Sequence, residues 1–407
     1  MERTELKKLV SETGAADECG EFTFLCDPKW SVEQRARVIE LMAQAEGGTA
    51  NVERRTSNAE RRTPNIERRT SGGEHRTPNI ADGWLCVPTG GTTGGVRFAR
   101  HDERTLSAAV SGFCRHFGLR QVNAVDVLPP HHVSGLMARV RSAATGGEHV
   151  PWEWKRLEAG ETPVVTGGPW VISLVPTQLQ RLLGSRKAIA WLREFEIIFV
   201  GGGPVWTELA EEAASAQLRV SLSYGMTETA AMVAALRPEE FLAGARSSGA
   251  ALPHAKIRVN AEGVVGIAGE SVFRGYWPEA RTAREFTTVD LGRIDEHGQL
   301  HLLGRRDAVI ITGGKKVQPA EVEAALRASG EFADVAVIGV PNTEWGEVVV
   351  ACYPAGGRAP DLARAVAALV GPLRPKRFVA VADWPRNAQG KVNRAELARV
   401  TAANSVE

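Results

Sequence analysis

The chain has 407 residues, of which 43% are hydrophobic and 24% charged, a balance typical of globular proteins that form a core. Its formal net charge of +1 gives no whole-molecule reason to expect nucleic acid or an acidic membrane as a partner. Five scattered cysteines without a C-x-x-C pair argue against a disulfide framework and a zinc module. Together with a charged N-terminus and no long apolar run, they predict a cytoplasmic protein without membrane insertion.

Residues 51–78 differ from the rest of the chain because they repeat N-x-E-R-R-T-S/P with a period of seven. A coiled coil would need two apolar positions per heptad, whereas the first three copies have one each, and Pro64 and Pro78 would interrupt a helix. We therefore expect residues 51–80 to be a low-complexity insertion that follows an N-terminal α/β segment at 1–50. The excess of arginine leaves a nucleic-acid or phosphate-binding arm as the alternative.

Beyond the insertion, short apolar runs alternate with helical stretches, which predicts an α/β fold with a layered sheet and helices on both of its faces. Glycine-punctuated β-prone runs around 249–274 predict a smaller β subdomain. We expect these parts to form one large domain over 81–305. The predicted strands are 84–88, 124–128, 170–175, 196–200 and 220–223, and a helix is predicted at 104–118.

A further region over 306–407 reads as a small α+β domain. Its pattern predicts helices at 321–328 and 362–370 and strands at 334–340 and 348–353.

The first chemical motif is P-T-G-G-T-T-G-G-V-R at 88–97. Glycines allow successive backbone N–H groups to form a nest for anionic oxygens, and threonine hydroxyls and Arg97 add donors and charge. It lacks the G-K-[ST] ending of a Walker loop. A flexible surface turn is an equally good interpretation of this motif taken alone.

Two further motifs are ambiguous by themselves. His131 and His132 are adjacent and could bind a metal, but no third ligand is evident, so histidines that pack or line a pocket are the better interpretation. The segment F-V-G-G-G-P at 199–204 runs from a strand into glycines, where a flat ring could approach the backbone. It could equally be a plain strand-to-helix connection.

The segment S-Y-G-M-T-E at 223–228 follows another predicted strand, and open α/β sheets bind ligands at the carboxyl ends of their strands. A tyrosine can stack on a base, a threonine can reach a phosphate and a glutamate can hold Mg²⁺. Later in the chain come Asp290, Arg305 and a G-G-K-K run at 313–316. Lys391 follows on a glycine-flanked loop, where an isolated lysine is usually just solvated.

Taken together, these segments resemble the adenylate-forming superfamily of acyl-CoA synthetases, nonribosomal adenylation domains and luciferases. The resemblance covers about residues 82–400, with the motifs in the same order and spacing. The stretch 89–97 is similar to the family's T-S-G-T-T-G-x-P-K phosphate loop, but has Gly90 for serine, Val96 for proline and Arg97 for lysine. The resemblance implies an enzyme that uses ATP and Mg²⁺ to adenylate a carboxylic acid and then transfers the acyl group to coenzyme A.

The resemblance also implies how ATP is held. Tyr224 would pack on adenine, Thr227 would contact phosphate, and Glu228 would bind Mg²⁺, the last two being catalytic. Asp290 and Arg305 would hold the ribose hydroxyls. The other nucleotide-binding positions implied are Thr89, Gly90, Gly91, Thr92, Thr93, Gly94, Arg97, Gly202, Gly203 and Gly225.

For the reaction itself, the resemblance makes Lys391 the catalytic lysine that bridges the carboxylate and the α-phosphate. Asp307 would be the hinge about which the C-terminal domain rotates. The loop that would line the coenzyme A tunnel contains Gly313, Gly314 and Lys315. The implied acid-binding residues are His132, which is also counted as catalytic, and Ser134, Gly201, Gly225 and Met226.

Within the superfamily, H-V-S-G-L at 132–136, S-L-V-P-T-Q-L-Q-R-L-L at 173–183 and G-M-T-E-T-A at 225–230 look like the o-succinylbenzoate–CoA ligases of menaquinone and phylloquinone synthesis. Ser134, Arg139 and Arg141 are candidate donors to the second carboxylate of such a substrate. The alternatives are an aryl- or fatty-acyl-CoA ligase, an enzyme that loads a carrier protein, and a non-catalytic adenylate-binding regulator. The oligomeric state stays open, a homodimer being one possibility.

Overall fold

The computed structural model describes residues 1–42, 83–90, 96–281, 283–386 and 392–403. The repeat at 51–78 lies outside these residues. Among the described residues, no helix is both long and apolar enough to cross a membrane. All five cysteines are free thiols.

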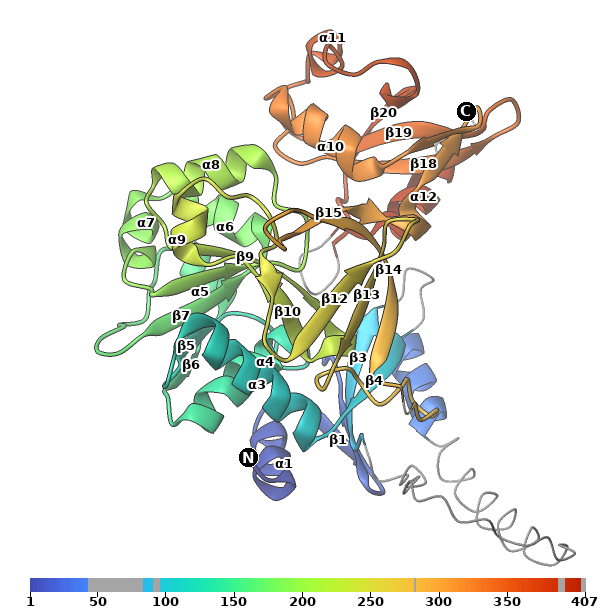
Figure 1. Cartoon of the computed structure of the whole chain (residues 1–407). Coiled ribbons are helices and arrows are strands. Elements are labelled where there is room, and N and C mark those ends of the chain that lie inside the picture. The colour runs from blue at the N-terminus through green and yellow to red at the C-terminus, as the bar shows by residue number, and fades with distance from the viewer. Residues whose placement is uncertain (43–82, 91–95, 282, 387–391, 404–407) are drawn as a thin grey trace, which may run out of the picture.

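A seven-stranded sheet forms the centre of the large domain (Figure 1). Its strand order is β11-β10-β9-β8-β7-β5-β6, and the pairs from β6 to β9 are parallel. The strands are β5 (Asn123–Asp126), β6 (His149–Pro151), β7 (Trp170–Leu174), β8 (Ile197–Val200), β9 (Val220–Met226), β10 (Ala231–Ala235) and β11 (Ala250–Ala251).

Helices cover both faces of this sheet, because its central parallel strands are buried on both sides. On β8, Ile198 and Val200 join one core cluster while Ile197 and Phe199 join another on the opposite face. The first face is covered by α5 (Trp154–Glu158), α6 (Pro176–Leu183), α7 (Arg186–Leu192), α8 (Thr207–Ser215) and α9 (Pro238–Leu242). The second is covered by α3 (Glu103–Phe117) and α4 (Val133–Thr145).

A second sheet lies on the other side of α3 and α4, because Leu106 and Leu136 from these helices share a core cluster with Leu85 and Val87. Its order is β1-β2-β3-β4, and α1 (Arg3–Ser11) packs into the same cluster. The strands are β1 (Ala16–Cys19), β2 (Phe22–Leu25), β3 (Leu85–Gly90) and β4 (Val96–His101), and residues 32–42 are helical.

A third sheet, β12-β13-β14-β15, packs against the edge of β9 and β10 through Val265, Ile267 and Leu300. Between β9 and β10 lies η1 (Thr227–Thr229). The strands are β12 (Ala255–Val259), β13 (Val264–Gly269), β14 (Glu285–Ile294) and β15 (Leu300–Arg305).

After η2 (Arg306–Ala308) the chain enters a separate five-stranded sheet, which Figure 1 shows in orange and red above the third sheet. The strands are β16 (Ile310–Thr312), β17 (Lys315–Val317), β18 (Ala336–Asn342), β19 (Gly346–Pro354) and β20 (Arg377–Val381). The helices are α10 (Pro319–Ala328), α11 (Leu362–Ala365), η3 (Gly371–Leu373) and α12 (Arg394–Ala403).

The layered α/β architecture and the small C-terminal α+β sheet confirm the predicted fold class. Two local predictions were wrong. The helix expected at 362–370 ends at Ala365, because Val366 leaves helical geometry, while Val366 and Leu369 remain buried in a turn. The motif at 88–97 is not one loop, since β3 extends through Gly90 and β4 begins at Val96.

Candidate active site

The hairpin of β3 and β4 carries the first predicted phosphate contacts. Its antiparallel register places Thr89 opposite Arg97. The Arg97 guanidinium lies 4.2 Å from the ring centroid of Tyr276 and stacks over it, a favourable cation–π contact. Residues 91–95 lie outside the described part of the chain, so the structure tests none of the predicted roles of Gly91, Thr92, Thr93 and Gly94.

Glu228 lies at the centre of a hydrogen-bonded group next to this hairpin. Its carboxylate is buried and accepts a 2.6 Å hydrogen bond from the Tyr276 hydroxyl and a 3.4 Å bond from Thr89 Oγ1. Both bonds end on Oε1. Burial, together with the negative charge of Glu228, raises the pKa of Tyr276 well above its usual value, so this hydroxyl stays a donor. A fixed carboxylate with one oxygen engaged suits Mg²⁺, which prefers oxygen ligands.

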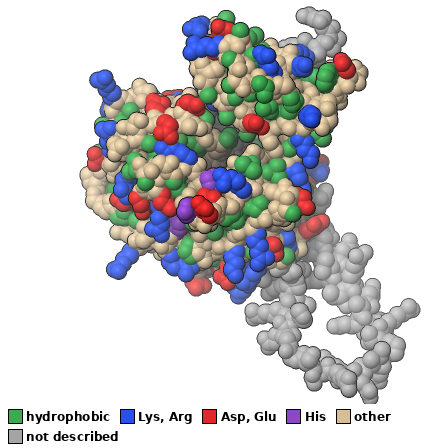
Figure 2. Space-filling model, turned by 45° about the horizontal axis from the view of Figure 1, so that its top comes forward, with side chains coloured by type: hydrophobic (Ala, Val, Ile, Leu, Met, Phe, Trp, Pro, Cys, Tyr) green, Lys and Arg blue, Asp and Glu red, His purple; other side chains and the backbone are tan. Residues whose placement is uncertain are grey.

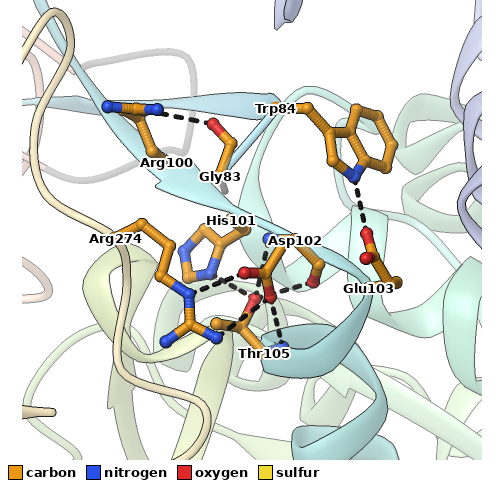
Figure 3. A network of polar contacts seen from close by, with 8 residues as sticks. All are labelled: Gly83, Trp84, Arg100, His101, Asp102, Glu103, Thr105 and Arg274. Carbon is orange, nitrogen blue, oxygen red and sulfur yellow. Dashed lines mark hydrogen bonds and ion pairs between the residues drawn. The ribbon is translucent and has the colours of Figure 1, made fainter. Parts of the chain in front are cut away.

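His101 holds the backbone of the neighbouring Thr227 in place. Its Nε2 lies 2.7 Å from the Thr227 carbonyl oxygen, which can only accept, so Nε2 carries the proton. Its Nδ1 lies 3.1 Å from Thr105 Oγ1. Asp102, the next residue in sequence, forms a bidentate ion pair with Arg274 (Figure 3). The guanidinium nitrogens lie 2.6 and 3.2 Å from the two carboxylate oxygens. This network fixes the end of β4 and the start of α3 beneath Thr227.

Burial lowers the pKa of His101 to about 4, since desolvation disfavours the imidazolium. A depressed folded-state pKa stabilises the protein above the unfolded value near 6.5, and this contribution falls as pH drops toward 4. We expect the thermal midpoint to decline from pH 7 to pH 5, and His101→Gln to lower it at pH 7 while making its pH dependence shallower. Thermal scans at several pH values test this, and an unchanged pH dependence in the variant would contradict it.

A second polar group joins three strands. Tyr224 on β9 donates a 2.6 Å hydrogen bond to Asp290 Oδ2, and the β14–β15 register places Arg305 opposite Asp290. The Arg305 guanidinium lies 3.6 Å from Asp290 and forms a paired contact of 2.9 and 2.7 Å with Asp307. The structure thus brings together four residues that sequence reasoning assigned to adenine, ribose and hinge.

The glycines after β8 and within β9 allow close approach of other groups. A Cβ on Gly225 would lie 2.0 Å from the Ala231 carbonyl oxygen, and one on Gly201 would lie 2.8 Å from Ser223 Oγ. Gly202 has a φ of 76°, which side chains disfavour. Gly203 has open space beyond a contact with Pro176. Glycine is therefore needed at 225 and 201 because neighbouring atoms lie close, and at 202 because of its positive φ.

The residues predicted to bind the acid lie at the start of α4 and the end of β9. His132 is the N-cap of α4, and His132, Ser134 and Met226 are all half-buried. The two arginines offered as donors to a second carboxylate have other contacts. Arg139 pairs with Glu12 at 3.0 Å, and Arg141 is buried with its guanidinium 4.2 Å from the Phe113 centroid.

In the C-terminal sheet, Gly313 and Gly314 form the exposed turn between β16 and β17, followed by exposed Lys315. The turn needs glycine because both residues have positive φ and a Cβ on Gly313 would lie 2.7 Å from Trp345.

Lys391 lies outside the described residues, but the described residues on either side of it are anchored. A bridge pairs Arg386 with Val392, Arg386 forms an ion pair with Asp334, and Arg394 lies 2.6 Å from Glu323.

Sequence reasoning missed Tyr276 and His101, although each touches a predicted site residue. Tyr276 follows Gly275, whose φ of 107° marks a special turn, and it lies far from the other motifs in sequence. A lone histidine at the end of a strand carries no pattern. The combination of a glycine with two aromatic residues in R-G-Y-W at 274–277 could have identified Tyr276.

Comparison with known proteins places the chain in a family. The family model described as AMP-binding enzyme matches residues 21–277, and the AMP-binding enzyme C-terminal domain matches residues 321–391. A 2-succinylbenzoate–CoA ligase of Geobacillus kaustophilus is 32% identical over 77% of this chain and 68% of its own length. A probable 2-succinylbenzoate–CoA ligase of Mycobacterium tuberculosis is 33% identical over 77% and 84%. An indoleacetate–CoA ligase of Aromatoleum aromaticum is 30% identical over 78% and 67%.

Among solved structures, o-succinylbenzoate CoA synthetase from Bacillus subtilis with its acyl-adenylate intermediate matches with a TM-score of 0.66 at 25% identity, covering 78% of this chain and 69% of that one. ATP-bound MatB from Rhodopseudomonas palustris matches with a TM-score of 0.64 at 27% identity, covering 78% and 67%. The match to a 2-succinylbenzoate–CoA ligase of Oceanobacillus iheyensis spans 60% of that protein's length at 31% identity. The chain belongs to the AMP-binding enzyme family.

Proposed function

We propose that this protein is an AMP-forming acid–thiol ligase that adenylates o-succinylbenzoate with ATP and transfers the acyl group to coenzyme A. One observation carries the proposal: Tyr224, Asp290 and Arg305 form a single polar group. Glu228 lies four residues after Tyr224 in the sequence. The relatives named as 2-succinylbenzoate–CoA ligases support this choice of acid.

In the first half-reaction, the substrate carboxylate would attack the α-phosphorus of ATP and release pyrophosphate. The nucleophile is already ionised, so catalysis depends on positioning and charge neutralisation rather than on a general base. Tyr224 would stack on adenine, while Asp290 and Arg305 would bind the ribose hydroxyls. Glu228 would hold Mg²⁺, which would neutralise phosphate charge when bound. Lys391 would bridge the carboxylate and the α-phosphate.

In the second half-reaction, a thiolate would attack the acyl-adenylate and release AMP. We propose that the C-terminal domain, residues 306–407, turns about Asp307 and replaces Lys391 with the turn at Gly313, Gly314 and Lys315. In the structure Arg305 donates two hydrogen bonds to Asp307, and Arg305 is also proposed to bind the ribose hydroxyls. Nucleotide binding at Arg305 would therefore alter the contact that restrains the hinge.

The proposal is tested by pyrophosphate release from ATP with o-succinylbenzoate, benzoate and octanoate offered separately, with and without coenzyme A. We expect release with o-succinylbenzoate and, with coenzyme A, the matching thioester by mass spectrometry. Release only with another acid would leave a ligase but exclude this substrate. No release with any acid would contradict the enzymatic proposal and favour a non-catalytic adenylate-binding regulator.

A further inference from the structure

Asp27, His131 and His132 form a cluster outside the polar groups described above. Asp27 follows β2, whereas the two histidines precede α4, so the fold supplies the third ligand that the sequence around the histidines lacked. One potential ligand atom from each of the three residues lies within 4.8 Å of the others. Asp27 and His131 are only 6% and 5% exposed. The sequence shows no third ligand near the histidine pair, and the fold brings a candidate one from a distant segment.

The geometry of the buried pair is unusual for a simple hydrogen bond. His131 Nε2 lies 3.3 Å from Asp27 Oδ2, yet it makes no hydrogen bond of acceptable geometry with the described residues. Ligands bound to zinc at about 2.0–2.1 Å in a tetrahedron lie roughly 3.3 Å apart. The nitrogen and oxygen are thus spaced as two ligands of a common ion would be.

Neighbouring backbone groups orient these side chains. The other oxygen of Asp27, Oδ1, accepts a 2.8 Å hydrogen bond from the backbone N–H of Lys29. The backbone N–H of His132 donates to the Pro129 carbonyl at 3.0 Å, which fixes the turn that presents both rings. Such outer contacts hold metal ligands in place and are a regular feature of metal sites.

A cavity of about 250 Å³ borders the cluster, with Asp27 and His131 in its wall and exposed Lys29 beside them. It is large enough for a water molecule to complete the coordination of an ion held by three protein ligands.

We propose that Asp27, His131 and His132 bind one divalent transition metal ion of the zinc class. Two imidazoles and one carboxylate favour such ions over Mg²⁺, which selects oxygen ligands. The ion would link the N-terminal segment to the start of α4 and fix His132, which borders the proposed acid site. The site does not depend on the proposed ligase reaction, and its test does not use activity.

The test measures metal binding to the untagged full-length protein after chelator treatment and removal of the chelator. We expect one Zn²⁺ per chain by elemental analysis, and Co²⁺ should give the visible absorption of a tetrahedral site. Asp27→Asn keeps the side-chain volume and an acceptor for Lys29 but removes the charge. His131→Phe removes a ligand. Each should weaken Zn²⁺ binding more than about 100-fold, beyond the usual effect of losing an outer-shell partner.

His297→Ala is the matched control, because His297 is 77% exposed on its side chain and pairs with neighbouring Glu296 rather than with this cluster. It should bind Zn²⁺ as the unaltered protein does. If the unaltered protein retains no Zn²⁺, or if Asp27→Asn binds it equally tightly, the proposal is overturned. Should His131→Phe fold poorly in thermal scans without metal, Asp27→Asn still decides the result.

Discussion

Replacing Lys391 with alanine should slow acyl-adenylate formation by about two to three powers of ten and leave thioester formation from preformed adenylate nearly unchanged. Two unit charges about 4 Å apart interact by roughly 4 kcal/mol at an effective dielectric near 20. Each 1.36 kcal/mol or so of transition-state stabilisation is a factor of ten in rate. A single lysine between the carboxylate and the α-phosphate can therefore supply this factor, whereas the second half-reaction would proceed with that lysine withdrawn.

The two half-reactions are measured separately, the first by pyrophosphate release without coenzyme A and the second by consumption of synthetic acyl-adenylate with coenzyme A. Lys155→Ala is the control, because Lys155 is an exposed lysine on α5, away from the polar groups of the site. If Lys391→Ala lowers the rates of both half-reactions equally, this result would contradict the proposal that the domain exchanges Lys391 for the turn at 313–315.

Charged side chains of both signs are mixed on one face of the molecule. Figure 2 shows lysine and arginine side chains intermingled with aspartate and glutamate over the visible face, in keeping with the net charge of +1. Arg97, a predicted phosphate contact, is held locally over the Tyr276 ring.

Hydrophobic periodicity predicted most of the fold, because buried parallel strands are continuous apolar runs. The run before Gly201 became β8, whose residues face two different cores. Periodicity could not predict that α3 and α4 lie between two sheets, since contacts such as Leu106 with Leu85 join distant segments. It also overestimated the length of the helix that begins at Leu362. Val366 and Leu369 are buried at a spacing typical of a helix, but they lie beyond the end of α11.

The candidate site was predictable where a motif carried the residue, as for Tyr224 and Glu228. It was not predictable where tertiary structure alone supplies the partner. Tyr276 reaches Glu228 from the connection between β13 and β14, and Asp27 reaches His131 from the N-terminal segment. Single residues of this kind have no spacing rule, so only the folded backbone reveals them.

Replacing Glu228 with glutamine should reduce the rate of adenylation by about two or more powers of ten and raise the Mg²⁺ concentration needed for half-maximal activity. Glutamine keeps the size of the side chain but removes the negative charge that would hold Mg²⁺. Its amide could still accept the hydrogen bond from Tyr276, which now ends on Oε1 of the carboxylate. The measurement is pyrophosphate release at fixed ATP over a range of Mg²⁺ concentrations.

Tyr276→Phe separates the charge of Glu228 from its orientation. This variant leaves the carboxylate but removes the 2.6 Å hydrogen bond, while its ring can still lie under Arg97. We expect a weaker apparent affinity for Mg²⁺ that excess Mg²⁺ largely restores, whereas Glu228→Gln should stay slow at saturating Mg²⁺ because the charge is gone. If Glu228→Gln adenylates as fast as the unaltered enzyme at every Mg²⁺ concentration, Glu228 is not the metal ligand. Its bonds to Tyr276 and Thr89 would then serve only to join the β3–β4 hairpin to the end of β9.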